Sequence, residues 1–310
     1  MSQINNIYGD THLANELTGL IGGSGLGDML ADKIEDVKYI AVATPFGKPS
    51  DRIMTGRLGQ RRVAFINRHG KGHRFSPATV PYAANIYALK KVGVHSIIST
   101  CAVGSLRQLI RPGELVIVNQ IIDKTTGRIS SFYNSYGAVH CEMAWPTCGR
   151  LGKKISTMTG GLEVKTHKAG TYVCMNGPQF STRAESLMHR KWGGDLIGMT
   201  AMPEAKLARE AQICYSLVAL VSDYDCWQVR HAHRGRPQRW KDKQELLREI
   251  IGNLQRASGN CLKLIEKVLE SGENLTDENC GCRKSLELAV WTDKNTISAK
   301  EKKKVEVLFE

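Results

Sequence analysis

The chain has 310 residues, 42% hydrophobic and 24% charged, so it can bury a substantial core without disulfides or a metal. This composition excludes a wholly disordered chain, a collagen-like repeat and a small disulfide scaffold, and no apolar stretch approaches the roughly 20 residues of a transmembrane helix. The 43 basic and 30 acidic residues give a net charge of +13, which favours anionic partners without choosing among phosphate esters, nucleic acid and acidic lipid.

Nine cysteines are scattered along the chain, and an odd number without framework spacing argues against a secreted disulfide fold. Cys280 and Cys282 form the only close pair in the sequence. Because tetrahedral zinc sites usually carry two ligand pairs, we expect no metal site and thiols that are mostly buried and reduced. The N-terminus, MSQINNIYGD, lacks a basic segment followed by an apolar core, so we expect no secretory signal and a cytoplasmic protein.

Apolar runs of strand length alternate with helix-like stretches. The predicted strands are Val37–Ala43, Val63–Asn67, His95–Ser99, Leu115–Ile121, Thr171–Met175, Leu196–Thr200 and Tyr215–Val221. The predicted helices are Tyr82–Val92, Thr182–Trp192, Pro203–Ala211 and a long one over roughly Lys241–Leu269. The apolar stripe of the last helix should pack on the sheet. This alternation indicates an α/β domain that binds ligands in the loops beyond the carboxyl ends of its strands.

Three segments are candidates to hold an anion. In Gly22-Gly23-Ser24-Gly25-Leu26-Gly27 the glycines let backbone amides approach closely and Ser24 adds a hydroxyl, although a simple tight turn explains the segment equally well. Arg68-His69 follows a predicted strand, and Arg offers a planar fork of donors that matches phosphate oxygens. Thr100–Ser105 also follows a strand, and its small residues leave room for backbone amides to face a ligand.

A fourth segment carries two carboxylates after a very apolar strand, Leu217–Val221. Asp223 and Asp225 are two residues apart, so on extended backbone their side chains point the same way. Like charges in a partly dry cleft raise one pKa, which suits proton donation. The alternative is that one aspartate caps the next helix and the other is solvated.

Taken in order, these segments resemble the nucleoside phosphorylase superfamily and, within it, the 5′-methylthioadenosine phosphorylase family. The matching stretches are IGGSGLGD, TPFGKPSD, RHGKGH, PYAANIYALK, CAVGSL, PGELVIVNQIIDKTTGRISSFY, NGPQFSTRAES, GMTAMPEAKLAREA and SDYDCW. They run from about Leu20 to Trp227. The resemblance implies a single α/β domain with a central mixed β-sheet or distorted barrel flanked by helices, usually in a homotrimer. We expect this domain over 1–272 and a C-terminal helix with a charged tail over 273–310.

The resemblance implies a pentosyltransferase that cleaves 5′-methylthioadenosine with inorganic phosphate, giving adenine and 5-methylthioribose 1-phosphate for purine and methionine salvage. Phosphate is a co-substrate, and no cofactor or metal is expected. The phosphate-binding residues implied are Ser24, Arg68, His69, Cys101, Ala102 and Thr200. The nucleoside-binding residues implied are Phe180, Ser181, Met199 and His140, the last from a neighbouring subunit. Asp223 is the implied proton donor to N7 of the leaving purine, and Asp225 helps to hold that proton.

Base preference follows from two positions. Phosphorylases for 6-oxopurines resemble this family but carry Glu where Ser181 stands and Asn where Asp223 stands. An Asn donates to O6, whereas a carboxylate accepts from an amino group, so we expect a preference for 6-aminopurines. The chain departs from the family pattern at Ser24 and Cys101, where Thr is commoner, and at Asn176, where an acid is common. A basic insertion over about Arg230–Trp240 interrupts the stretch that lines the pocket for the 5′ group in the family. The resemblance therefore does not decide whether the substrate carries a methylthio, a hydroxyl or another group at its 5′ position.

Other functions stay open at this stage. A phosphorylase for 6-oxopurine nucleosides or methylthioinosine would use the same scaffold, and a nucleosidase would use water in place of phosphate. A basic nucleic-acid-binding protein is a more distant alternative, since aromatic residues make up only 6% and no recognised binding motif is present. A catalytically lapsed member of the family is disfavoured because both aspartates and the Arg68-His69 pair are retained.

Overall fold

The computed structural model describes residues 16–23, 29–30, 32–228, 243–293 and 295–309, without the side chains of residues 243 and 246. The strands are β1 Leu17–Gly22, β2 Glu35–Ile40, β3 Ile53–Leu58, β4 Arg61–Asn67, β5 Ser96–Ser105, β6 Leu115–Val118, β7 Gln120–Asp123, β8 Thr166–His167, β9 Thr171–Cys174, β10 Leu196–Gly198 and β11 Cys214–Tyr224. The helices are η1 Lys71–His73, α3 Tyr82–Lys91, α4 Gly149–Thr157, α5 Arg183–Lys191, α6 Ala201–Glu210, α7 Lys243–Glu270, η2 Gly281–Lys284, α8 Ala299–Val305 and η3 Glu306–Phe309.

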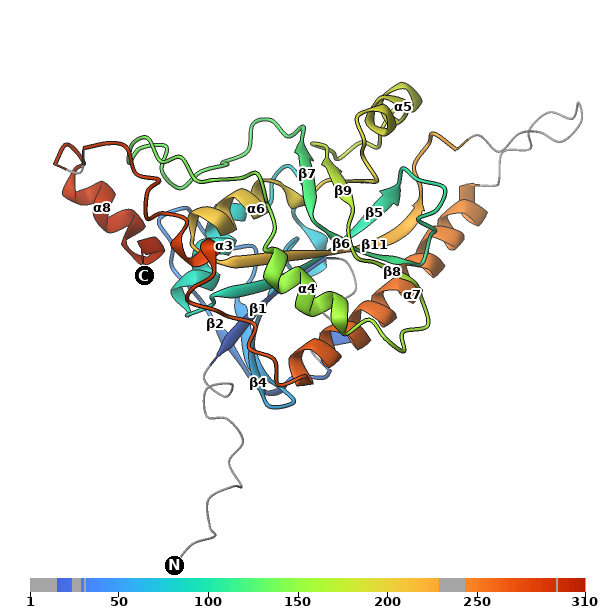
Figure 1. Cartoon of the computed structure of the whole chain (residues 1–310), viewed down its shortest axis with the longest axis horizontal. Helices are drawn as coiled ribbons and strands as arrows, with labels where there is room; N and C mark the ends of the chain where they lie inside the picture. Colours follow the sequence, from blue (N-terminus) through green and yellow to red (C-terminus); the bar gives the residue numbers. More distant parts are fainter. Residues whose placement is uncertain (1–15, 24–28, 31, 229–242, 294, 310) are drawn as a thin grey trace, which may run out of the picture.

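The strands form one mixed sheet that branches at β5 (Figure 1), which confirms the predicted α/β class. The main path runs β2-β3-β4-β1-β5-β10-β9-β7, and β11 also pairs with β5. Strands β4, β1, β5 and β11 are mutually parallel, whereas β10 runs antiparallel to β5. The carboxyl ends of four neighbouring strands therefore meet at one edge, which is where loops bind ligands in α/β proteins.

Helices cover both faces of this sheet. On one face, α3 and α6 contribute buried residues such as Ile86 and Leu207 to the same apolar cluster as Ile97 of β5. On the other, α4 and α7 contribute Leu151 and Ile265 to a second cluster. Because successive residues of a strand point to opposite faces, a strand buried throughout, such as β1, is apolar or small along its whole length.

The structure differs from the predicted elements in three ways. The strand predicted over Leu115–Ile121 is divided at Asn119 into β6 and β7, which pair with different neighbours. Strands β1, β3 and β8 and helix α4 were not predicted. The apolar stripe of α7 is buried only in part: Leu247 is 56% exposed and Ile251 45% exposed. The 28 helical residues span about 42 Å, more than the roughly 36 Å of the 11-residue strand β11 that α7 covers.

The segment after α7 packs along the molecule. Leu275 and Cys282 join the cluster beneath α7, whereas Val305 and Leu308 join the cluster beneath α3 and α6. The division into a phosphorylase domain over 1–272 and a C-terminal segment over 273–310 stays a prediction. Among the helices that the structure describes, none combines the length and the apolar character that crossing a bilayer requires.

Candidate active site

Arg68 follows the last residue of β4, at the carboxyl edge of the sheet. Gly70 turns the chain at this point, with a φ of 69° and an N–H that donates to Asn67 O at 3.0 Å. A Cβ on Gly70 would lie 2.7 Å from Ser50 O, so crowding and the positive φ both require glycine. This turn fixes the position from which the Arg68 side chain extends.

The Arg68 guanidinium is buried and held in one orientation. Its Nε and Nη2 donate to the two carboxylate oxygens of Glu204 at 2.8 and 3.0 Å, and Nη2 also donates to Ser99 Oγ at 2.6 Å. Burial lowers the pKa of Arg68, but the charge of Glu204 and the hydrogen bond to it outweigh burial and raise the pKa above its ordinary value. The side chain therefore carries a permanent positive charge.

Nη1 of the same guanidinium lies beside Gly23. It carries two hydrogens, and the described contacts account for one of them, a 2.8 Å bond to Thr100 O. A Cβ built on Gly23 would lie 3.5 Å from Nη1. An anion that approached along this glycine would meet a charged donor whose geometry is already set.

His69 presents a neutral ring. Its Nδ1 lies 2.8 Å from Phe75 O, and since a carbonyl oxygen only accepts, Nδ1 carries the proton. Burial lowers the pKa of His69 to about 4, although the bond to Phe75 opposes that shift. The ring stacks on His73 with centroids 4.0 Å apart. Nε2 of the neutral ring is an acceptor, suited to the hydrogen of monohydrogen phosphate.

Cys101, within β5, and Thr200, two residues after the end of β10, meet at one hydroxyl. Cys101 Sγ lies 4.0 Å from Tyr172 Oη, and the Thr200 N–H donates to the same oxygen at 3.2 Å. All three residues are buried, and burial raises the pKa of Cys101 to about 11, so the thiol is neutral and a weak donor. Ala102, the next residue on β5, is exposed. The structure thus brings these phosphate-binding candidates to one edge of the sheet.

Asp223 and Asp225 lie together over Gly104 of the neighbouring strand. Between β11 and β5 the register shifts, so that Val221 faces Val103 while Asp223 faces Gly104. Such a bulge redirects side chains. A Cβ on Gly104 would lie 3.6 Å from Asp223 Oδ2 and 3.4 Å from Asp225 Cβ. These distances place both aspartate side chains beside Gly104, on the same side of β5.

Asp223 has the ionisation suited to proton donation. Burial, and then the charge of Asp225, raise the pKa of Asp223 to about 6. The Ser222 hydroxyl opposes this shift, because it donates to Asp223 Oδ1 at 2.6 Å and so favours the ionised form. Asp225 is buried, and its Oδ2 has no hydrogen-bond partner among the described residues. That carboxylate oxygen therefore keeps its capacity to accept a hydrogen bond.

Strand β5 joins the two halves of the site. Arg68 donates to Thr100 O, and the aspartates approach Gly104, four residues further along the same strand. Four extended residues span at most about 13 Å. The cation and the acidic pair therefore approach the same strand at points no more than about 13 Å apart along it.

Met199 lies alongside β5, between these halves. Ile197 of β10 pairs with Gly104 of β5, and the two strands are antiparallel. The chain that follows β10 therefore runs back alongside β5, past Ala102. Met199 O accepts from Arg128 Nη1 at 2.9 Å, and a Cβ on Gly177 would lie 2.5 Å from Met199 Sδ. These contacts fix the carbonyl and the thioether at the middle of the site.

The remaining nucleoside-binding candidates divide into two groups. Ser181 lies near the aspartates, because its backbone carbonyl accepts a hydrogen bond from the Cys226 thiol at 3.3 Å. The neighbouring Phe180 side chain is 87% exposed, which leaves its ring able to cover a ligand. His140 is exposed and its described contacts lie elsewhere: its ring meets Trp291 with centroids 4.9 Å apart and its N–H donates to Ala289 O. Its action from a neighbouring subunit stays a prediction.

Two predicted features fall outside the described residues, namely Ser24 and the basic insertion over Arg230–Trp240.

The sequence analysis missed Glu204 and Arg128. Glu204 is 2% exposed and accepts from Arg68, and its position among Ala201, Ala205 and Ala208 on one helix stripe signals a buried carboxylate that requires a cation. Arg128 holds Met199 O. It also donates from Nη2 to Asn176 O at 2.7 Å and from Nε to Asn176 Oδ1 at 3.3 Å, so the departure at Asn176 places a neutral amide on this guanidinium. No pattern near Arg128 signals these contacts.

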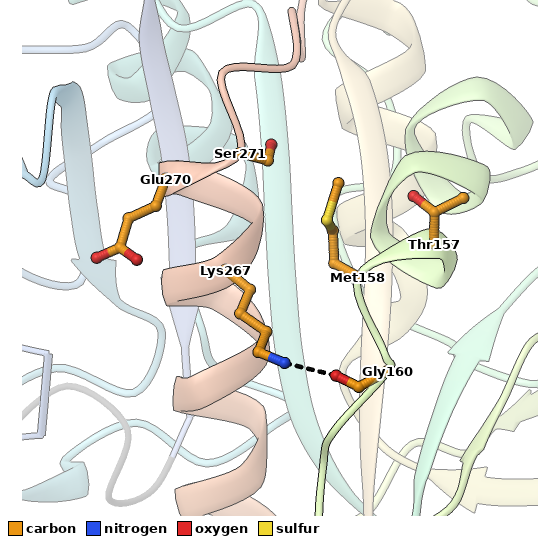
Figure 2. Close-up of a pocket in the computed structure, with 6 residues that line it drawn as sticks. All are labelled: Thr157, Met158, Gly160, Lys267, Glu270 and Ser271. Carbon is orange, nitrogen blue, oxygen red and sulfur yellow. Dashed lines mark hydrogen bonds between the residues drawn. The ribbon is translucent and has the colours of Figure 1, made fainter.

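A surface hollow of about 340 Å³ lies apart from these residues (Figure 2). Its lining comes from the end of α4 and the end of α7, where Lys267 donates to Gly160 O. Asn253, earlier on α7, donates to Ser222 O. Lys267 is 14 residues further along, or about 21 Å of helix. The hollow is therefore not part of the site at the strand ends.

Comparison with known proteins gives concordant results. A sequence profile of the phosphorylase superfamily matches residues 18–270. The S-methyl-5′-thioadenosine phosphorylase of Geobacter sulfurreducens is 41% identical over 295 residues, which cover 95% of this chain and 98% of that protein. The corresponding enzyme of Cereibacter sphaeroides is 52% identical over 219 residues, or 71% and 74% of the two chains.

Solved structures resemble the fold over most of its length. A methylthioadenosine phosphorylase from an antarctic soil metagenomic library superposes with a TM-score of 0.82 at 38% identity, covering 94% of this chain and 98% of that one. An adenosine/methylthioadenosine phosphorylase mutant from Schistosoma mansoni, in complex with methylthioadenosine, gives a TM-score of 0.78 at 31% identity and covers 89% and 99%.

Proposed function

This chain belongs to the phosphorylase superfamily, and we propose that it cleaves S-methyl-5′-thioadenosine with inorganic phosphate. The products are adenine and 5-methylthioribose 1-phosphate, so the protein is a pentosyltransferase of purine and methionine salvage. The observation that carries this proposal is the arrangement along β5, with Arg68 at Thr100 and the acidic pair at Gly104.

Phosphate binds at the Arg68 end of the site. Arg68 supplies charge and a donor, while Cys101, Thr200, the backbone of Ala102 and Ser24 supply further hydrogen bonds. His69 accepts the phosphate hydrogen at Nε2. As the bond from C1′ to the purine N9 breaks, the ribose gains positive charge, and the nearby anion stabilises it while one phosphate oxygen forms the new bond to C1′. Met199 packs on the ribose.

The purine leaves with a proton rather than as an anion. The electron pair of the C1′–N9 bond passes into the ring, and Asp223 delivers its proton to N7. A pKa near 6 makes Asp223 a competent donor close to neutral pH. Asp225 accepts from the 6-amino group through the carboxylate oxygen that has no partner among the described residues. Ser181 contacts the base edge, and Phe180 covers the base or the sugar.

The same residues favour an amino group at C6. Protonated Asp223 directs its hydrogen to N7 and the Asp225 carboxylate accepts hydrogen bonds, so a 6-oxo oxygen would face the Asp225 acceptor without a donor. Mispaired buried polar groups can cost about 10⁴-fold in discrimination. Adenine nucleosides are therefore the preferred substrates.

Assembly and location complete the proposal. The protein acts as a homotrimer in the cytoplasm, and His140 of one subunit reaches the 5′ end of the nucleoside bound by another. Light scattering coupled to size-exclusion chromatography tests the assembly: a mass of three chains supports it, and a monomer at assay concentration contradicts it.

The decisive experiment is a panel of four nucleosides assayed with and without phosphate. Methylthioadenosine, adenosine, methylthioinosine and inosine vary the 5′ and C6 groups independently. The proposal expects phosphate-dependent release of adenine, fastest from methylthioadenosine, with little turnover of either inosine. Faster cleavage of the inosines would favour a 6-oxopurine phosphorylase, and cleavage without phosphate would identify a nucleosidase.

A further inference from the structure

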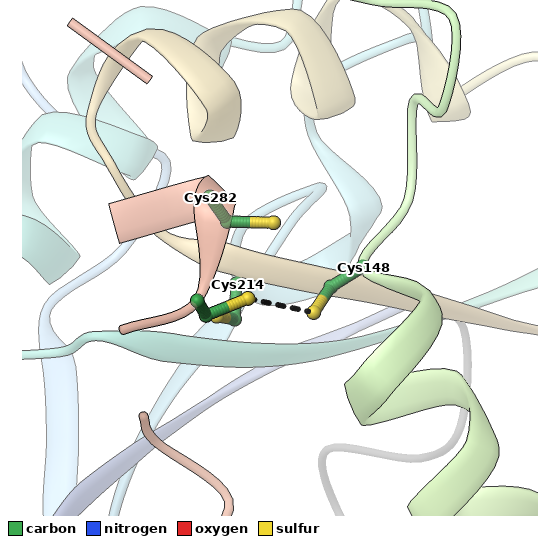
Figure 3. Close-up of side chains that lie close together, drawn as sticks. Cys148, Cys214 and Cys282 are labelled. Atoms are coloured by element: carbon green, nitrogen blue, oxygen red, sulfur yellow. Dashed lines mark hydrogen bonds between the residues drawn. The ribbon is translucent and has the colours of Figure 1, made fainter. Parts of the chain in front are cut away.

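Four cysteine side chains converge in the core beneath α7, away from the carboxyl ends of the strands. Cys148, Cys214, Cys280 and Cys282 have sulfur atoms that all lie within 4.8 Å of one another, and three of these residues are buried. Figure 3 shows Cys148, Cys214 and Cys282 pointing toward a common centre. The proposed reaction uses none of these thiols.

The spacing of these sulfur atoms suits a tetrahedral ion. Zinc binds thiolate sulfur at about 2.3 Å, so the corners of a tetrahedral site lie about 3.8 Å apart. Cys148 Sγ and Cys280 Sγ are 3.7 Å apart. A disulfide requires about 2.05 Å between its sulfurs, so all four side chains stand as free thiols at ligand spacing.

The four ligands come from three separate segments. Cys148 is the N-cap of α4, Cys214 is the first residue of β11, and Cys280 with Cys282 flanks the start of η2. No second close pair of cysteines accompanies Cys280 and Cys282 in the sequence, so a metal site was not expected. The fold supplies the second pair as Cys214 and Cys148, which lie 66 and 132 positions before Cys280.

Donors and positive charge surround the cluster. The Leu151 N–H donates to Cys148 Sγ at 3.5 Å, and Arg150 Nη2 donates to Cys214 Sγ at 3.7 Å. Arg150 also binds Leu275 O at 2.6 Å, and Arg283 binds Gln212 O at 2.7 Å. Four thiolates around Zn²⁺ carry a net charge of −2, and N–H donors to sulfur of this kind stabilise such a site.

We propose that Cys148, Cys214, Cys280 and Cys282 bind one Zn²⁺ as a tetrathiolate site that fastens the C-terminal segment to the core. Binding replaces up to four thiol protons, which pass to solvent, and it requires no oxidant or reductant. Cys214 and Asp223 stand nine residues apart on β11, or about 30 Å. The ion therefore has a structural role, and the proposal does not depend on the proposed function.

The test uses the reduced full-length protein and Co²⁺ as a spectroscopic substitute. Titration should reach one Co²⁺ per chain, with thiolate-to-cobalt charge transfer and the intense visible bands of tetrahedral Co²⁺, and Zn²⁺ should displace it. Cys148→Ala and Cys282→Ala should lose this spectrum. The matched control is Cys261→Ala, which removes an equally buried thiol that belongs to the same core but lies outside the cluster. This variant should retain the Co²⁺ spectrum.

Thermal unfolding provides a second measurement. Zn²⁺ should raise the Tm of the wild type and of Cys261→Ala by several degrees and leave the two ligand variants unshifted. If the ligand variants fail to fold, the stoichiometry and spectrum of the wild type decide alone. Absence of bound Co²⁺ or Zn²⁺ under reducing conditions overturns the proposal, as does a denatured thiol count that reveals disulfides among these cysteines. Enzymatic activity is not a readout, so failure here leaves the proposed function intact.

Discussion

Arg68 and Glu204 are joined by two parallel hydrogen bonds, Nε to Oε2 at 2.8 Å and Nη2 to Oε1 at 3.0 Å, and both side chains are at most 2% exposed. Glu204 stands on α6, four residues after Thr200, so the pair connects the end of β4 to the loop that also carries Met199. The pair thus orients the guanidinium that we propose binds phosphate, and it ties together two segments of the candidate site.

A substitution that removes only one partner of this pair should lower the free energy of unfolding more than a double substitution that removes both. Arg68→Met leaves the Glu204 charge buried and unpaired, which costs about 3–5 kcal/mol of unfolding free energy. Arg68→Met/Glu204→Met should recover part of that loss and still lack phosphorolysis. Denaturant unfolding of the wild type, the two single variants and the double variant measures the coupling. Additive losses would show that the two charges do not stabilise each other.

Asp223→Asn should lower kcat/KM for adenine nucleosides by about 10²–10⁴-fold, because an amide cannot deliver a proton to N7. The ratio of inosine to adenosine turnover should rise, since the amide can donate to O6. The Tm should not fall, because the change removes one of two adjacent carboxylates. Steady-state kinetics and thermal unfolding check the three outcomes. A variant with wild-type turnover of methylthioadenosine would remove Asp223 from its role as the acid.

Ser222→Ala should move the pH profile in one direction. The Ser222 hydroxyl stabilises ionised Asp223, so its loss raises the Asp223 pKa above its present value of about 6. Catalysis needs the protonated acid, so the alkaline limb of kcat/KM should shift to higher pH. The ionisation of phosphate is the same in assays of the wild type and of the variant. The difference between their two pH profiles therefore reports the ionisation of Asp223. An unchanged profile, or a shift to lower pH, would contradict this assignment.

Cys101→Thr should lower the KM for phosphate. A hydroxyl is a better donor than the neutral Cys101 thiol, and one added hydrogen bond contributes about 0.5–1.5 kcal/mol, or a factor of about 2–12. Cys101→Val is the matched control, because it has the shape of threonine without the hydroxyl and should give no such gain. Equal KM values for the two variants would place the hydroxyl out of reach of phosphate.

The sequence determined most of the strand and helix pattern, and with it the edge of the sheet at which we expect ligands to bind. Periodicity placed α3 within one residue of its observed end, because its apolar residues recur at helical spacing. The spacing of Asp223 and Asp225 predicted two carboxylates on one side of an extended segment, and the structure places both against Gly104. These inferences succeed because they depend on neighbours in the chain.

Only the tertiary structure decided which distant residues meet. Glu204 lies 136 positions from Arg68, Arg128 lies 71 positions from Met199, and the four clustered cysteines come from three segments. Helix α4 also escaped prediction, since only Leu151 and Ile155 of its residues are buried. Burial turns a carboxylate into a partner that a cation must satisfy, and the order of strands in the sheet, which no local pattern encodes, determines which side chains share that buried space.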